Sequence, residues 1–396
     1  MAMLEASRLF LVQFQFGLVS ALLLGFAALG LGLAWMLALW RLAGHLLGKA
    51  TIDPPFRFWL RVFALVCYAT VGFGLLLLVQ VAVSWPPLLE RVGNVIGPVL
   101  AIVTVLTFIV KSTFLSVLLY GLHRVTPARY TFCAVATAVG FTLVVLGVLI
   151  VDSWFRAPEG ATLVDGRYQV FDWAAVLWNT QVPVQAVLVA WGALLAVCGV
   201  VIAVSAHQAR VQSDDMAPQG LLAVVLLVGL SGVALTWPMI EHVTAAVMGS
   251  APTLLSLLDG TAPVPLWVVA VARTSVGLAL LLFLALTFGV VQWSGPSPGA
   301  EPIRRPLAWT LGLGSVAGVL LWLMLWLLLQ MDRGEYLVAR SLSVADLVSE
   351  QPPVVLLGGL VAIGLVSLLI VGGVVRLVMS VSLRGVIPVH RSRVLP

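Results

Sequence analysis

Long uncharged runs, separated by short clusters of charged and turn-forming residues, dominate the hydropathy pattern of this chain. A hydrocarbon core about 30 Å thick needs about 20 apolar residues per helix, and each run is long enough to cross it. Only helices satisfy the backbone in lipid over runs this uniformly apolar, so the pattern excludes a β-barrel. The predicted spans cover about residues 9–40, 58–84, 95–122, 130–151, 183–206, 220–240, 265–293, 307–331 and 353–375.

Prolines punctuate these predicted helices. Pro183 is expected at the start of the fifth span, because proline fits the first turn of a helix. The Pro-Pro pairs that begin at Pro54, Pro86 and Pro352 are expected at the ends of spans.

Composition supports an integral membrane protein. Hydrophobic residues make up 61% of the chain and charged residues only 9%, far from the balance of a soluble domain. The longest connecting stretches, 152–182, 241–264 and 332–352, are too short for a separate soluble domain. The chain is therefore predicted to be all-α and polytopic, with residues 1–396 forming a single transmembrane domain.

Charge predicts the orientation. An odd number of spans puts the two termini on opposite sides of the membrane. Most of the 21 Lys and Arg residues fall in predicted loops on the side of the C-terminus, and most of the 16 acidic residues fall on the other side. By the positive-inside rule the C-terminus is cytoplasmic and the N-terminus is outside. The net charge of +5 then reflects loops that face anionic lipid, so it does not indicate nucleic acid as a partner.

Lys111 interrupts the third predicted span. A charged side chain near the bilayer centre costs about 2.5–3.5 kcal/mol, so it is expected to face a partner, a polar interior or a water-filled path. The partner is either a carboxylate on another subunit or a set of carbonyls and polar groups. Two alternatives need no partner: the side chain extends to the membrane surface by snorkelling, or the amine is neutral. The polar side chains considered are those of Tyr68, Thr70, Gln80 and Thr104.

Arg273 lies about two turns into the seventh predicted span. Asp152, at the outer end of the fourth span, is a candidate counter-ion. An arginine that snorkels to the outer interface is an equally good interpretation.

The candidate metal ligands are few. The three cysteines, Cys67, Cys133 and Cys198, all lie inside predicted spans at spacings that form no metal signature, and buried thiols usually act as packing residues. The five histidines all fall in loops or at the ends of spans: His45, His123, His207, His242 and His390.

Several segments resemble subunit I of the cytochrome bd quinol oxidases. They are "LEASRL" near the N-terminus, "RFWLRVFAL", "VQVAVSW", the third-span text "GNVIGPVLAIVTVLTFIVKSTFLSVLLYGLHRV", "VDSWFRAP", "VPLWVVAVARTSVG" and "DRGEYLVARSLSVADLVS". The resemblance covers most of the chain. It implies cytochrome bd subunit-like helix bundles, with nine spans and an outside N-terminus, in the cytoplasmic membrane of a prokaryote.

The departures from the family concern its cofactors and substrate. In the family, histidines in the first and fifth spans and a methionine in the seventh hold the haems. Here the first and fifth spans contain no histidine, and Ser275 stands where the methionine is expected after Arg273. Val103 and Lys111 replace the glutamates of the third span, and the connection at 241–264 is short where the family has its long quinol-binding loop.

The resemblance and the departures together predict a haem-free structural subunit of a quinol oxidase complex, with no catalytic, cofactor or metal residues of its own. Its expected partner is a haem-bearing subunit I homologue that carries haem b and haem d, and quinol is expected to react only through the complex. Two alternatives stay open. One is an active, divergent oxidase subunit that holds haem through Cys198 or Met324; the other is a transporter or channel with Lys111 and Arg273 in its path.

Overall fold

The computed structural model describes residues 2–48, 54–121, 124–212, 336–338, 341–348 and 351–384. The predicted sixth, seventh and eighth spans lie outside these residues. So does Arg273.

Six of the described helices are long and apolar enough to span a membrane. They match the first five and the ninth predicted spans. The spanning units are α1 (Ala2–Leu46), α2 (Pro54–Ser84), α3 (Pro86–Ile109) continued by η1 (Val110–Leu115) and α4 (Ser116–Tyr120), α5 (Pro127–Arg156), α7 (Val182–Gln212) and α14 (Pro353–Arg384). The chain is therefore a mostly helical, multi-pass membrane protein.

The prolines mark helix starts, as predicted. Pro54, Pro86 and Pro353 each begin a helix, and Pro183 is the second residue of α7. The third helix starts earlier than its hydropathy indicated, at Pro86 instead of about Val95. Its first turns lie beyond the apolar run and carry the exposed Glu90, because a helix can continue past the hydrocarbon into the interfacial region.

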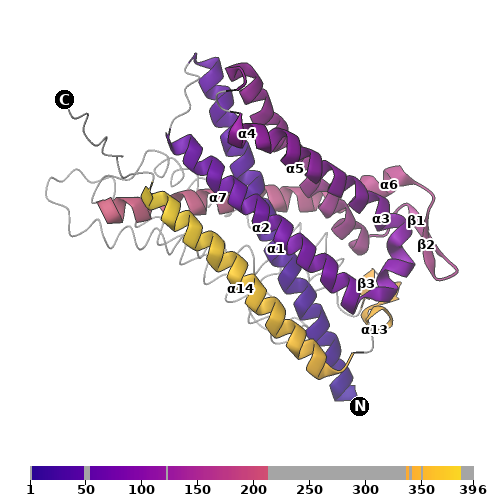
Figure 1. Cartoon of the computed structure of the whole chain (residues 1–396). Helices are drawn as coiled ribbons and strands as arrows, with labels where there is room; N and C mark the ends of the chain where they lie inside the picture. Colours follow the sequence, from indigo (N-terminus) through magenta and orange to yellow (C-terminus); the bar gives the residue numbers. More distant parts are fainter. Residues whose placement is uncertain are drawn as a thin grey trace, which may run out of the picture.

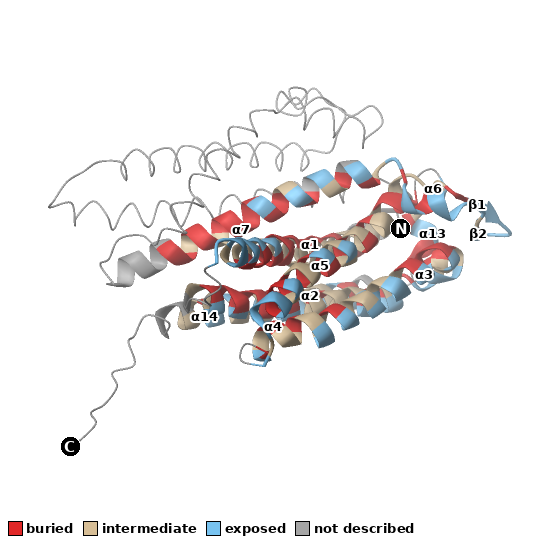
Figure 2. Cartoon of the chain, turned by 90° about the horizontal axis from the view of Figure 1, so that it is seen from above, coloured by how far each residue is buried: buried red, intermediate tan, exposed pale blue. Residues whose placement is uncertain are grey.

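Helix α1 lies at the centre of the described bundle and packs against α2, α5, α7 and α14 (Figure 1). Figure 2 shows the buried residues on the sides of the helices that face one another. The main core cluster contains Ala28, Leu33, Phe63, Val66, Ala138 and Ile202, which are all almost completely buried.

Glycines let three helices approach α1 and α5 closely. A Cβ atom at Gly32 of α1 would lie 2.5 Å from the carbonyl oxygen of Ala193 on α7, and one at Gly30 would lie 2.6 Å from the ring of Phe141 on α5. Gly147 of α5 receives the side chain of Val103 on α3 in the same way. Small residues at such crossings allow the dispersion contacts that hold helices together in lipid.

A small cap covers the end of the bundle where the chain begins. It consists of the antiparallel hairpins β1 (Ala161–Val164) with β2 (Arg167–Val170) and β3 (Tyr336–Val338) with β4 (Leu342–Ser343), and of the short helices α6 (Trp173–Leu177) and α13 (Val344–Leu347). Figure 1 shows these elements beside the start of α3 and the start of α14. The all-α prediction is wrong for this cap.

The physical reason for the first hairpin is its turn. Asp165 and Gly166 have φ values of 49° and 75°. Two consecutive left-handed residues form the turn whose twist matches a pair of antiparallel strands, and Asp-Gly is among the pairs that adopt it most easily. The ring of Tyr168 then packs at 5.0 Å from that of Trp154, at the end of α5. The Tyr168 hydroxyl donates a hydrogen bond of 2.6 Å to Ser341 in the second hairpin.

The close crossing at Gly32 generates a prediction. Gly32→Ala should destabilise the protein by about 1–3 kcal/mol, because the new methyl group would meet a backbone oxygen that cannot rotate away. The matched control is Gly97→Ala on α3, where a Cβ atom would meet nothing within 4 Å. Thermal unfolding in detergent measures both, and equal midpoints for the two variants would contradict the packing argument.

Candidate functional site

Lys111 lies in a π-helical turn, η1, between α3 and α4. At 1.5 Å of rise per residue, about 14 Å of helix separates it from Tyr120 at the end of α4, so it lies near the middle of a hydrocarbon core about 30 Å thick. Its amine donates a hydrogen bond of 3.2 Å to the carbonyl oxygen of Cys67 on α2. The acceptor is thus a backbone carbonyl, one of the two kinds of partner expected.

The π-helical turn changes the direction of the side chains on this helix. A π turn inserts one residue into the helical repeat, so the residues after it are rotated relative to those before it, and such turns are frequent at functional sites. The helix itself continues without a break into α4. Lys111 therefore has a position that a regular α-helix through the same residues would not give it.

Two of the side chains proposed as polar neighbours of Lys111, those of Thr70 and Thr104, make other bonds. The hydroxyl of Thr70 donates to the carbonyl of Val66, and that of Thr104 donates to the carbonyl of Leu100. Gln80 is buried, and neither atom of its amide has a hydrogen bond. Within the part of the chain that the structure describes, the carbonyl of Cys67 is the one acceptor of the Lys111 amine.

Asp152 lies near the C-terminal end of α5 and pairs with Arg156 one turn later. The Nε atom of Arg156 donates to a carboxylate oxygen of Asp152 over 3.2 Å, and the two side chains are only 9% and 17% exposed. Since Arg273 lies outside the described residues, its predicted pairing with Asp152 stays a prediction.

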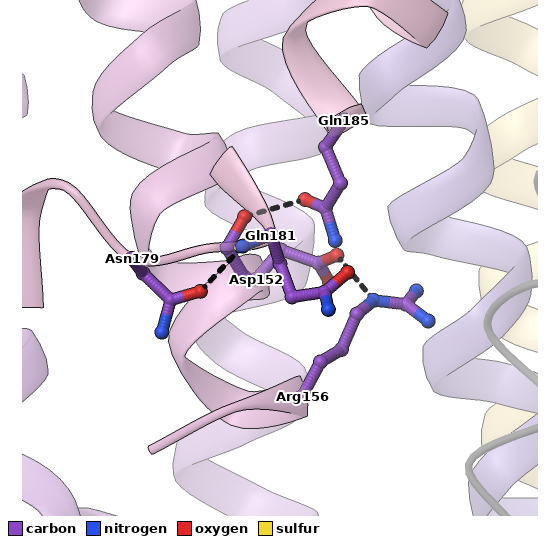
Figure 3. A network of polar contacts seen from close by, with 6 residues as sticks. Asp152, Arg156, Asn179, Gln181 and Gln185 are labelled. Atoms are coloured by element: carbon purple, nitrogen blue, oxygen red, sulfur yellow. Dashed lines mark hydrogen bonds and ion pairs between the residues drawn. The ribbon is translucent and has the colours of Figure 1, made fainter. Parts of the chain in front are cut away.

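A buried polar network joins the end of α5 to the start of α7 (Figure 3). The hydroxyl of Ser153 donates to the side-chain oxygen of Gln185 over 2.9 Å. The backbone N–H of Gln181 donates to the side-chain oxygen of Asn179 over 2.9 Å, and the Asn179 amide donates to the carbonyl of Ala157. The sequence analysis missed this network, although the "VDSW" segment and the polar Gln185 in an apolar span were visible signals.

Arg41 forms a second polar anchor, near the other end of the bundle. Its guanidinium lies 5.2 Å from the ring centre of Tyr130 and 5.9 Å from that of Phe56. It also donates to the hydroxyl of Thr131 over 3.4 Å. An arginine this close to two aromatic rings is stabilised by cation–π attraction. This contact holds α1, α2 and α5 together.

Histidine, a common axial ligand of haem iron, is scarce in the described helices, with His45 on α1 and His207 on α7. Haem iron needs an imidazole, thiolate or thioether at its axial position. His45 is exposed at the end of α1, whereas Cys67 and Cys198 are buried in the packed core cluster. The close crossings at Gly30 and Gly32 bring α1 into direct contact with α5 and α7, which leaves no width for a porphyrin at those crossings. No group of three or more His, Cys, Asp or Glu that could hold a metal occurs in the described ranges.

The fold and its spans define a multi-pass helical membrane protein, and sequence comparison gives its family. A family model described as "Cytochrome bd terminal oxidase subunit I" matches residues 11–253, more than half of the chain. The chain belongs to this family. The resemblance read from the sequence motifs is confirmed.

Individual relatives agree with this assignment. The chain is 26% identical over 258 residues to the cytochrome bd ubiquinol oxidase subunit 1 of Bacillus subtilis (strain 168), covering 64% of this chain and 54% of the relative. It is 28% identical over 151 residues to the cytochrome bd-II ubiquinol oxidase subunit 1 of Escherichia coli (strain K12), covering 38% and 29%. The match therefore spans about half, or less, of these relatives' own length.

A solved structure extends the likeness to almost the whole fold. The chain matches a chain in the structure of the bd oxidase from Geobacillus thermodenitrificans with a TM-score of 0.76. The match covers 95% of this chain and 98% of that chain, at 17% identity. At so low an identity the likeness concerns the fold alone.

The buried network at the start of α7 generates a prediction. Ser153→Ala should cost about 1–3 kcal/mol, because it leaves the oxygen of Gln185 buried without a donor. Gln185→Leu removes that oxygen, so Ser153→Ala should cost much less in a Gln185→Leu background. Unfolding of the four proteins in detergent gives the coupling energy of the pair. Additive effects of the two changes would show that the hydrogen bond contributes nothing.

Proposed function

We propose that this chain is a haem-free, subunit I-like structural subunit of a cytochrome bd-type quinol:oxygen oxidoreductase complex in the cytoplasmic membrane of a prokaryote. Its partner is a haem-bearing subunit I homologue that carries haem b and haem d. Quinol is oxidised by the complex through that partner.

One observation carries the proposal: the membrane-embedded part of the sequence contains no imidazole. The family resemblance implies axial histidines in the first and fifth spans. Helix α1 carries one histidine, His45, which lies exposed near its end, and α7 carries one, His207, beyond its apolar stretch. Without a strong axial donor at the depth of the cofactor, iron is not held.

The proposed topology has nine spans, an outside N-terminus and a cytoplasmic C-terminus. The cap, which contains both hairpins, lies at the end of the bundle where α1 begins, so the N-terminus and the cap share the outer side. Arginines cluster at the opposite end, as the positive-inside rule requires of the cytoplasmic face. They are Arg41, Arg57, Arg61, Arg124 and Arg129.

A chain that oxidises quinol itself is the rival proposal. The printed names of the relatives, which are ubiquinol oxidase subunits, favour it. The rival needs an unfamiliar iron ligand, for which the buried thiol of Cys198 is a candidate within the described part of the chain. Haem content therefore separates the two proposals.

Expressed alone and purified, the chain should contain no stoichiometric haem, because it offers no axial histidine in its spans. A pyridine haemochrome assay measures this, and a histidine-bearing subunit I prepared in the same way is the control. One or more haems per chain would overturn the proposal. In the purified complex, replacement of His45 and His207 by Ala should leave the haem content unchanged.

A further inference from the structure

One outer face of the bundle carries polar side chains at mid-membrane depth. We call it the Lys111 face, and it consists of Tyr68 on α2 and Thr104, Phe108, Lys111 and Ser112 on α3 and η1. Tyr68 is 66% exposed and Phe108 is 72% exposed. Residues that face lipid at this depth are normally apolar. Tyr68 and Lys111, which lie among exposed apolar residues such as Val105 and Phe108, are therefore unusual for a lipid-facing surface.

Two groups of the Lys111 face have hydrogen-bond donors without an acceptor among the described residues. An ammonium group has three donors, and Lys111 donates to one acceptor, the carbonyl of Cys67. The phenol of Tyr68 has no hydrogen bond among the described residues, and its neighbour Thr70 donates to its own helix. Tyr68 directly follows Cys67, whose carbonyl accepts from Lys111, and both Tyr68 and Lys111 have a donor without an acceptor among the described residues.

Lipid cannot satisfy these groups. About 14 Å of helix separates Lys111 from Tyr120 near the membrane surface, far beyond the reach of a four-carbon stem to a headgroup phosphate. In hydrocarbon an unpaired ammonium costs about 2.5–3.5 kcal/mol even on the mildest scale. The Lys111 amine and the Tyr68 phenol therefore need a hydrogen-bond acceptor that itself lies at mid-membrane depth.

Charge identifies the acceptor. Two donor groups, one of them a cation, are best satisfied by a carboxylate, since charge-assisted hydrogen bonds are roughly twice as strong as neutral ones. A second copy of this chain cannot provide it, because all 16 acidic residues fall outside the central parts of the predicted spans. The occupant must be a different polypeptide.

We infer that Lys111 and Tyr68 form a receiving site for an Asp or Glu side chain on a transmembrane helix of the partner subunit. The inference rests on the proposed function, in which this chain pairs with such a subunit. The π-helical turn at Val110–Leu115 contributes by giving Lys111 its direction toward α2 and the face.

Photo-crosslinking in the intact complex in native membranes tests which molecule lies against the Lys111 face. Benzoylphenylalanine in place of the exposed Phe108 should give an adduct that maps to a partner helix, within one turn of a carboxylate. Leu194 on α7 is the matched control, since it is 47% exposed and α7 lies on the other side of the described bundle (Figure 2). Adducts at Phe108 with lipid alone, or with a second copy of this chain, would overturn the inference.

Charge exchange tests the ion pair. Lys111→Glu should reduce recovery of the complex by about tenfold or more, because it buries two like charges together. Changing the partner's mapped carboxylate to Lys should restore recovery in that variant. Lys111→Arg should retain the complex, and Tyr68→Phe should weaken it by a smaller factor of about two to ten. The matched control for loss of a cation is Arg61→Met, at an exposed position on α2.

Membrane insertion of every variant is measured separately, by its protease-protection pattern, so that a failure to fold is not read as a failure to associate. Failure of charge exchange to restore recovery, with normal insertion, would overturn the ion pair. Haem content decides the proposed function independently. An acidic partner helix at Phe108 together with haem bound by this chain would leave the receiving site intact and remove the haem-free role.

Discussion

Inside a bilayer every hydrogen-bonding group that the chain places in hydrocarbon must find its partner within protein, because lipid tails offer none. The helices meet this requirement for their own backbones. The structure shows three local solutions for side chains: hydroxyls such as that of Thr104 bond to their own helix, Ser153 and Gln185 pair with each other, and Lys111 takes a carbonyl of the neighbouring helix. The second and third solutions also fix how two helices lie against one another.

Packing follows the same constraint. Lipid tails are as apolar as leucine, so burial of apolar area does little to hold helices together, and close contact must do more. Gly32 against Ala193 and Gly147 against Val103 supply that contact. Where helices touch this closely there is no width for a flat cofactor at the crossing itself.

The two ends of the described bundle are stabilised by different means. The cap end has aromatic rings packed edge to face, such as Trp154 with Tyr168, and the Asp152–Arg156 ion pair. The other end has Arg41 beside the neighbouring rings of Phe56 and Tyr130. These anchors pair polar groups at both ends of the bundle. In the middle of the bundle, Lys111 and Tyr68 still have donors without an acceptor among the described residues.

Local signals decided which features could be predicted. The six described spans followed from hydropathy, and the start of the fifth followed from Pro183, because length, apolarity and proline geometry are properties of a short segment. The Asp165–Gly166 pair is also a signal within a short segment, and it could have predicted the first hairpin. Hydropathy alone predicts only the helices.

The sequence by itself determined that this is a multi-pass helical membrane protein of the cytochrome bd subunit I family, and that Lys111 needs a partner. Only the tertiary structure decided that the Lys111 amine donates to the carbonyl of Cys67, that Ser153 bonds to Gln185, and that Arg41 lies beside two aromatic rings. The reason is physical: each of these contacts joins residues far apart in the chain, and its geometry exists only once the helices have packed side by side.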